Sequence, residues 1–299
     1  MSCRVFDTKN GIIFFFKMLL SCMEGQLPRT PFEYISQSDD YIRCIPSDIK
    51  ALRLHHCPID DLPEALVENF GELHLLELYN TSFSKCHTQI KEAFPKMLAL
   101  SIVHSPMTIV PPNLLRLPLT TSELQISHTQ ITDLTPKKLS HLELKRLFLN
   151  YNQFQYIPKR LETLADVELL SLAGNPFEEI DLRLLPKTVE YLLLPSLSMD
   201  SIPPVLANPT YRRITHLYLN NNSIQSVVWD DMLTLLYEKN IFQLDGCPIC
   251  NKDKISKEKY DIVCQPTCAI GCIDSVFVGN SHCNIECNTP ACNYDGGDC

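Results

Sequence analysis

The sequence has little of several features that particular classes of protein require. It contains 9 glycines among 299 residues and a formal net charge of −9, and no apolar run reaches the length of about eighteen residues that a membrane-spanning helix needs. The scarcity of glycine argues against glycine-rich phosphate loops, and the negative charge argues against a nucleic-acid-binding polycation. The 45% hydrophobic content nevertheless excludes a disordered tail protein.

Signatures of catalysis are also missing from the sequence. It has no nucleophile elbow, no His-Glu-x-x-His motif and no spaced pair of carboxylates outside the turn at residues 295–298. We therefore predict a protein that is not an enzyme. An acid/base pair in a closed pocket would overturn this prediction, for example in favour of a hydrolase.

What the sequence does have is cysteine. Of 14 cysteines, nine lie between Cys247 and Cys299. This density is typical of a small disulfide-stapled module made in an oxidising compartment. Two glycosylation sequons, at Asn80 and Asn221, agree with a secretory route. We therefore expect an extracellular or luminal protein, either secreted or the ectodomain of a membrane protein.

Residues 1–26 form a separate segment. Arg4 and Lys9 precede an apolar stretch at residues 12–20 that Lys17 interrupts. Three interpretations are open: a signal peptide, a buried core strand, or the remnant of a longer membrane-anchored precursor. A membrane is expected as a partner only if this segment or a missing one anchors the chain.

A repeat of 22 to 25 residues organises the chain between residues 45 and 250. Each unit contains a Leu-x-Leu pair or a variant of it, usually followed three residues later by a small polar residue. The pairs begin at Leu52, Leu76, Leu100, Leu124, Leu147, Leu170, Leu192, Leu217 and Phe242.

The alternation predicts a short strand with one inward face, after which the polar residue turns inward to hydrogen-bond the backbone. Each unit leaves an apolar face that only its neighbour can cover. The pattern therefore predicts an α/β solenoid with a parallel sheet on its concave side. It resembles leucine-rich repeats (LRRs), and we assign residues 27–250 to this solenoid, with an N-terminal cap and about nine repeats.

Three cysteines fit the repeat register. Cys57 and Cys247 occupy the inward polar slot and Cys86 an apolar slot, so we expect all three to be buried core thiols. Burial raises the pKa of a thiol, which argues against catalysis by these residues. Leu197 cannot make the inward hydrogen bond, and we expect the seventh repeat to be irregular.

The register also predicts which side chains point to solvent from the concave face of the sheet. Towards its C-terminal half this face combines aromatic and small residues, a composition that partners exploit. We expect it to bind a protein or glycan, whereas no basic stripe suits a nucleic acid. The residues assigned to this binding face are Phe148, Tyr151, Tyr191, Leu193, Tyr218, His104 and His128. The alternative is an ordinary solvated sheet surface.

Two histidines of this face, His104 and His128, lie on adjacent rungs of the expected sheet. Their spacing would allow both histidines to bind one metal ion. Two imidazoles without a carboxylate or thiolate in reach are too few for a stable metal site. We therefore favour solvated histidines.

The C-terminal residues 265–299 form a second module. Its 32 residues from the first cysteine onward have few large apolar side chains, so disulfides and a metal must replace a core. The ending Cys-Asn-x-x-x-Cys-x-x-Asp-Gly-Gly-Asp-Cys resembles the Notch-type LNR module. That family pairs its cysteines first to fifth, second to fourth and third to sixth. The resemblance implies the disulfides Cys268 with Cys292, Cys272 with Cys287, and Cys283 with Cys299.

The same resemblance implies one calcium ion. Asp295, Asp298 and Asn280 match the family's ligand positions, and Phe277 could offer only its backbone carbonyl where the family often has an acidic residue. Oxygen ligands without histidine or free thiolate favour calcium over zinc. The alternative is a disulfide knot without a metal.

Residues 251–264 connect the two modules and are expected to cap the solenoid. Cys250 and Cys264 have no partner in either pattern, and we predict that they bond to each other. Such a loop of about fifteen residues contributes roughly 3 kcal/mol in the chain-entropy model. Cys3, Cys22 and Cys44 stay unassigned.

Together these features predict a non-enzymatic recognition protein that binds a partner through the concave face, with the LNR module at its end. The competing hypothesis is a regulatory ectodomain, or a fragment of one, in a membrane-anchored receptor. In Notch-like receptors LNR modules cover a protease site, but here the module could mask only a site on a partner chain.

Overall fold

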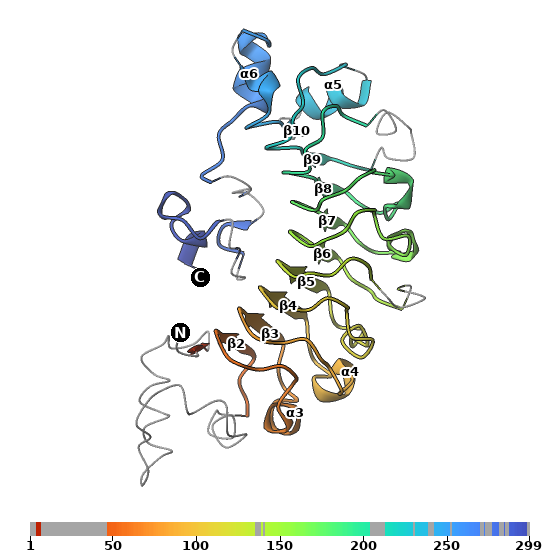
Figure 1. Ribbon diagram of the computed structural model, residues 1–299, viewed down its shortest axis with the longest axis vertical. Helices are drawn as coiled ribbons and strands as arrows, with labels where there is room; N and C mark the ends of the chain where they lie inside the picture. Colours follow the sequence, from red (N-terminus) through yellow and green to blue (C-terminus); the bar gives the residue numbers. More distant parts are fainter. Residues whose placement is uncertain are drawn as a thin grey trace. The chain divides into compact units, whose positions relative to one another are not determined.

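The computed structural model describes residues 4–6, 47–134, 139, 141–203, 213–229, 231–238, 242–251, 253–269, 272, 277–280, 284 and 287–297. The segment 1–26, apart from the backbone of residues 4–6, therefore lies outside the described residues, as do Cys22, Cys44, Cys283, Asp298 and Cys299. The chain forms two compact units, Met1–Phe148 and Leu149–Cys299. Each unit is described by itself (Figure 1).

The described residues of the first unit contain six strands and two short helices. Its elements are β1 (Arg4–Phe6), β2 (Ala51–His55), α3 (Glu64–Asn69), β3 (Leu75–Tyr79), α4 (Ile90–Ala93), β4 (Ala99–Val103), β5 (Glu123–Ser127) and β6 (Arg146–Phe148). The strands pair in chain order; β1 runs antiparallel to β2, and all later pairs are parallel. The helices α3 and α4 lie on the return segments, on the side of the repeats away from the sheet (Figure 1).

The second unit continues the repeats and ends in the cysteine-rich module. Strands β7, β8, β9 and β10 are parallel and pair in chain order. The elements are η1 (Leu161–Thr163), β7 (Leu169–Ser171), η2 (Leu182–Leu184), β8 (Tyr191–Leu193), β9 (His216–Tyr218), α5 (Asp231–Glu238), β10 (Phe242–Gln243), η5 (Pro248–Cys250), α6 (Lys257–Val263), η7 (Pro290–Cys292) and η8 (Asp295–Gly297).

The sheet register is the one that the repeat spacing predicts. Equivalent leucines of successive repeats are paired, as in Leu52 with Leu76 and Leu76 with Leu100. These leucines point inward, where phenylalanines of the return segments fill the space between sheet and helices. Phe70, Phe83, Phe94 and Phe154 are among the fully buried side chains. The fold is therefore a leucine-rich-repeat solenoid, as expected.

The inward polar residue can join a repeat to the one before it, as two asparagines do. Asn175 donates through Nδ2 to the carbonyls of Leu149 and Leu172, both at 2.9 Å, and its Oδ1 accepts the N–H of Asn152 at 3.2 Å. Asn222 makes the same kind of contacts two repeats later. These bonds satisfy backbone groups that the turn leaves buried without a partner in the ladder.

The residue just before the inward slot adopts a left-handed conformation in every described repeat. Its φ lies between 50° and 76° at His56, Asn80, His104, His128, Tyr151, Gly174, Ser196, Asn221 and Gly246. Only glycine, and to a lesser degree asparagine, adopts this conformation without a steric cost. At Gly174 a side chain is also excluded by packing, because an added Cβ would lie 2.2 Å from Tyr151 Cδ1.

The seventh repeat departs from its neighbours in the way expected from Leu197. Ser198 has a second positive φ, 57°, two residues after Ser196. Asn222 Oδ1 of the next repeat accepts the N–H groups of Leu197 at 3.0 Å and Met199 at 3.1 Å, as Asn175 Oδ1 does for the repeat before it. These N–H groups are therefore satisfied, and what is missing is the contact that a polar side chain at position 197 would make with the repeat before.

The three cysteines of the repeat register differ from one another. Cys86 and Cys247 are free and buried, and burial raises the pKa of both thiols, to about 12 for Cys86. The expectation of a free thiol at Cys57 is wrong, because Cys57 is disulfide-bonded, with a partner outside the described residues. The register places Cys57 in an inward slot but does not show which other segment reaches it.

We predict that Asn175→Ala lowers the free energy of unfolding by about 2–4 kcal/mol, because the Leu172 carbonyl and the N–H groups of Asn152 and Phe154 lose a buried partner. Urea denaturation followed by circular dichroism measures this loss. The control is Gln153→Ala, which changes an exposed side chain next to Asn152. It should alter the free energy of unfolding by less than about 0.5 kcal/mol. Equal stabilities of the two variants would contradict the role of the asparagine.

Candidate functional site

The expected binding face is more buried than its register suggests. The side chains of Phe148, Leu193 and Tyr218 are 3%, 0% and 7% exposed, so the prediction that they point to solvent is wrong. Burial of a large apolar side chain is favourable by about 1.5–3 kcal/mol relative to its exposure. The repeat register defines the direction of a side chain but not what lies over it.

Aromatic and imidazole rings remain half-exposed on this face in both units. In the first unit, the rings of His104 and His128 are stacked with centroids 4.4 Å apart, and the ring of Tyr79 meets that of His104 edge-on at 5.7 Å. In the second unit, the ring of Tyr191 stacks on that of His216 at 3.9 Å. Partial burial lowers the pKa of His216, although the neighbouring Glu190 opposes this shift.

Tyr151 is also half-exposed, and its ring lies over Gly174. Of the seven residues assigned to the face, four therefore keep accessible rings: His104, His128, Tyr151 and Tyr191. His216 belongs with them, although the assigned binding face did not include it. It precedes the Leu-x-Leu pair of its repeat and pairs with Tyr191, which holds the same position one repeat earlier.

Between the rings, the same face carries buried polar atoms without a hydrogen-bond partner. They are Ser127 Oγ in the first unit, and Asn150 Oδ1, Ser171 Oγ and both amide atoms of Asn220 in the second. Each such atom costs roughly 1–3 kcal/mol unless it finds a partner. Because these atoms have almost no accessible surface, they are not contact points for a ligand in this structure.

A charged cluster on β2 and β3 was also not predicted from the sequence. Glu77 is fully buried, although its register position predicts an exposed side chain. The Oε1 atom of Glu77 lies 2.6 Å from His55 Nε2, and its Oε2 lies 3.7 Å from Arg53 Nε. The carboxylate is thus balanced by its own neighbours, and the cluster stabilises the first rungs of the sheet.

The two sequons lie at equivalent turn positions of their repeats. Asn80 is exposed, and its Nδ2 donates to His56 Nδ1 at 2.9 Å. Asn221 is half-exposed next to Gly246. Both asparagines are left-handed, so the repeat geometry alone explains why asparagine occurs there.

The cysteine-rich region contains three disulfides among the described residues. Cys268 is bonded to Cys292, Cys272 to Cys287, and Cys250 to Cys264. The sulfur atoms of Cys268, Cys272 and Cys292 lie within 4.8 Å of one another, a spacing that would also suit a metal. Since these atoms belong to disulfides, they are not thiolate ligands, and we attribute the spacing to the packing of two disulfides.

The family's calcium ligands can be tested against the local structure. Asp295 is fully buried, and its Oδ2 accepts the N–H of Asn284 at 2.5 Å. The segment that carries Asn280 lies beside it, because the Gly279 N–H donates to the Asp295 carbonyl at 3.1 Å. The Phe277 side chain is buried, so only its backbone carbonyl could serve.

The turn after Cys292 brings its backbone unusually close to this segment. Residues 293–297 all have a positive φ, and a Cβ added to Gly296 would lie 2.8 Å from Gly279 Cα. Three of these five residues are not glycine, so the turn carries strain that other interactions must offset. The oxygen-rich, close-packed arrangement fits a calcium ion, with Asp295 and Asn280 as the described residues able to hold it.

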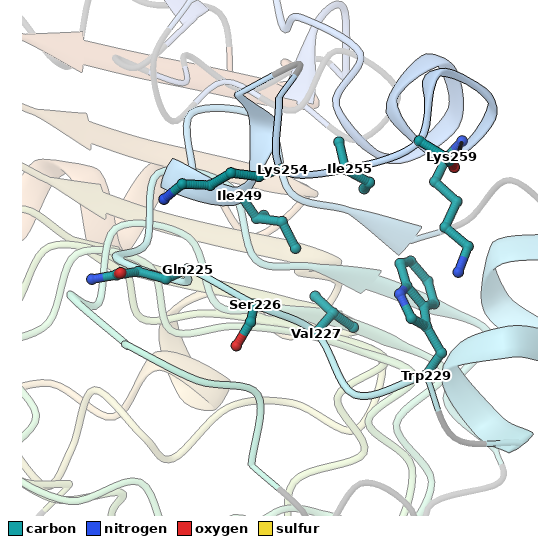
Figure 2. A pocket seen from close by; sticks show the side chains of 9 residues that line it. Gln225, Ser226, Val227, Trp229, Ile249, Lys254, Ile255 and Lys259 are labelled. Atoms are coloured by element: carbon teal, nitrogen blue, oxygen red, sulfur yellow. Dashed lines mark hydrogen bonds between the residues drawn. The ribbon is translucent and has the colours of Figure 1, made fainter.

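A cleft of about 270 Å³ lies in the last repeat and its cap (Figure 2). It is lined by Gln225, Ser226, Val227, Trp229, Ile249, Lys254, Ile255, Ser256 and Lys259. The Lys259 ammonium lies 4.0 Å from the centroid of the Trp229 ring, a cation–π contact. The cap contains helix α6, and the cleft itself does not follow from the sequence pattern.

Comparisons with known proteins agree with this architecture. Residues 260–299 match the family described as Notch: LNR domain. A stretch of 115 residues, 37% of this chain, is 32% identical to the human leucine-rich repeats and immunoglobulin-like domains protein 3, of which it spans 10%. The structure of an LRR protein from Leptospira interrogans superposes with a TM-score of 0.51 and 17% identity, over 68% of this chain and 50% of that one.

The chain is thus a leucine-rich-repeat protein with a C-terminal Notch-type LNR module. The disulfides agree with an oxidising environment. Among the described residues, no helix has the length and apolar character that crossing a membrane requires.

We predict that Gly296→Ala destabilises the LNR module more than Gly297→Ala does. Both variants place alanine at a positive φ, but only at position 296 would the new Cβ meet backbone, whereas nothing lies within 4 Å of one at position 297. The rate of reduction of the Cys272–Cys287 disulfide by dithiothreitol, followed by mass spectrometry, measures the difference. We expect the rate of reduction to be at least about tenfold higher in Gly296→Ala than in Gly297→Ala. Equal rates in the two variants would contradict the close packing.

Proposed function

We propose that the chain is a non-enzymatic extracellular recognition protein that binds a protein partner through the strand face of its repeats. This name denotes the side of the strands that carries Tyr79, His104 and His128 in the first unit and Tyr151 and Tyr191 in the second. The main support is that each unit presents half-exposed rings on this side of its strands. Aromatic rings contribute large contact area at a small entropic cost, and they are enriched in protein interfaces.

The strand face also carries polar side chains. Asn220 has an amide that can donate and accept at the same time, although it is buried in this structure, at 1% exposed. A peptide backbone or a sugar hydroxyl offers the complementary groups. A glycan is thus the second kind of partner that this face could bind, but the stacked rings favour a protein.

We further propose that the LNR module holds one calcium ion. The chain would supply Asp295, Asn280, the Phe277 backbone carbonyl and Asp298, of which the last lies outside the described residues. A cation would offset the cost of the buried Asp295 carboxylate and the strain of the left-handed turn. The ion's role here is to stabilise the module, and no chemical step depends on it.

We predict that Tyr151→Glu and Tyr191→Glu each weaken partner binding at least about tenfold, because a charge would be placed in a face that must lose water. The measurement uses the chain produced in eukaryotic cells and multimerised, tested against an array of cell-surface and secreted proteins. Tyr156→Glu is the matched control, because Tyr156 is 55% exposed and does not belong to the strand face.

Three results would contradict the proposal. They are equal losses in the control and face variants, unchanged binding in both face variants, or a partner that binds only the isolated LNR region. If the array shows binding only to glycans, and the face variants abolish it, the glycan alternative replaces the protein.

We predict that Asp295→Asn weakens calcium binding at least about 100-fold. Asparagine keeps the acceptor for the Asn284 N–H but loses the charge. Native mass spectrometry before and after chelation gives the calcium content, and Asp253→Asn, which changes an exposed carboxylate in the cap, is the control. Unchanged calcium content in Asp295→Asn, or none in the wild-type protein, would reject this assignment.

A further inference from the structure

The cleft beside Trp229 combines an apolar interior with a cationic rim. Val227, Ile249 and Ile255 form the apolar part together with the indole ring. Figure 2 shows Lys254 and Lys259 towards opposite ends of the cleft, with the aliphatic side chains between them. Val228, next to Trp229 in the sequence, is 84% exposed and extends the apolar surface outside the cleft.

The charge of the cleft is opposite to that of the chain. The sequence has 35 acidic residues against 26 lysines and arginines. None of the nine described residues that line the cleft is acidic, and two are lysines. Glu258 of α6 is hydrogen-bonded to the Tyr237 hydroxyl, and burial together with Glu258 raises the pKa of Tyr237. Because no acidic residue lines the cleft, its two lysines can attract an anion from outside.

The indole ring is held in place by its neighbours. The ring of Tyr237 meets it edge-on at 5.6 Å, and the ring of Phe242 does so at 6.1 Å. One side of the indole faces the Lys259 ammonium, which has three donors and uses the ring for one direction only. The remaining donors can bind a carboxylate while the apolar group that carries it rests on Val227 and Ile255.

We propose that this cleft binds an acidic segment of a protein partner, in which a glutamate or aspartate stands next to an aliphatic side chain. The volume of about 270 Å³ is below the usual range of small-molecule sites, about 300–1,000 Å³, and suits one or two side chains of a peptide. The two lysines complement the acid, and the aliphatic floor complements its neighbour. The site lies on the cap and is separate from the strand face.

The test uses the fact that Trp229 is the only tryptophan of the chain. The probe is the acetylated and amidated peptide Glu-Glu-Leu-Glu-Glu, added to the full-length protein while tryptophan emission is recorded. We expect a saturable change in emission. The Gln-Gln-Leu-Gln-Gln peptide should bind at least about tenfold more weakly, and Glu-Glu-Gly-Glu-Glu at least about threefold more weakly.

The double variant Lys254→Gln, Lys259→Gln should lose at least about tenfold in affinity, while Lys187→Gln, an exposed lysine outside the cleft, should lose none. Lys259 contacts the Trp229 ring, so its replacement could change the tryptophan emission directly. Fluorescence polarisation of a dye-labelled probe peptide therefore gives a second readout. Both lysines are surface residues, so folding is retained; circular dichroism checks this, and Lys254→Gln alone carries the test if the double variant unfolds.

Each of the following results would overturn the proposal: no saturable change up to about 10 mM peptide, equal binding of the neutral peptide, or unchanged binding in the lysine variants. If inorganic sulfate displaced the labelled peptide as strongly as the unlabelled peptide does, the cleft would be a general anion site. This result would also overturn the proposal. None of these outcomes depends on the strand face, so the proposed function is tested separately.

Discussion

The structure depends on one constraint, which is that the chain must turn inward at the end of every short strand without leaving its backbone polar groups unsatisfied. A left-handed residue makes the turn, and the next side chain binds carbonyl and N–H groups of two repeats, as Asn175 does. The steric cost of a left-handed non-glycine residue is about 1–2 kcal/mol. The hydrogen bonds of the inward asparagine and the burial of the leucines offset it.

Much of this could be predicted from the sequence, because the interactions link residues at a constant separation. The pairing of Leu52 with Leu76 and the inward position of Asn175 follow from the spacing alone. The left-handed residue was missed because His104 and Tyr151 are not types that favour this conformation, although Asn80 and Gly174 are. Here the position in the repeat, rather than the residue type, decides the backbone conformation.

The candidate sites were harder to predict, because they depend on segments that no regular spacing relates. The burial of Leu193 and the disulfide of Cys57 require knowledge of what covers one face of the sheet or reaches one slot. The Trp229 cleft joins a return segment, the turn at Ile249 and the helix that carries Lys259. In the LNR module, by contrast, a dense fixed pattern of cysteines and turn residues carried the prediction of ligands and pairs.

The inward asparagine has a consequence for how such an array can change. Because Asn222 binds the carbonyls of both Leu194 and Leu219, removing part of a repeat would strand polar groups in the repeat that remains. Inserting one or two residues within a strand would do the same. Whole units, in contrast, can be added or lost with every bond re-formed at the new junction. The array can therefore gain or lose strands only by whole repeats, each of 22 to 25 residues.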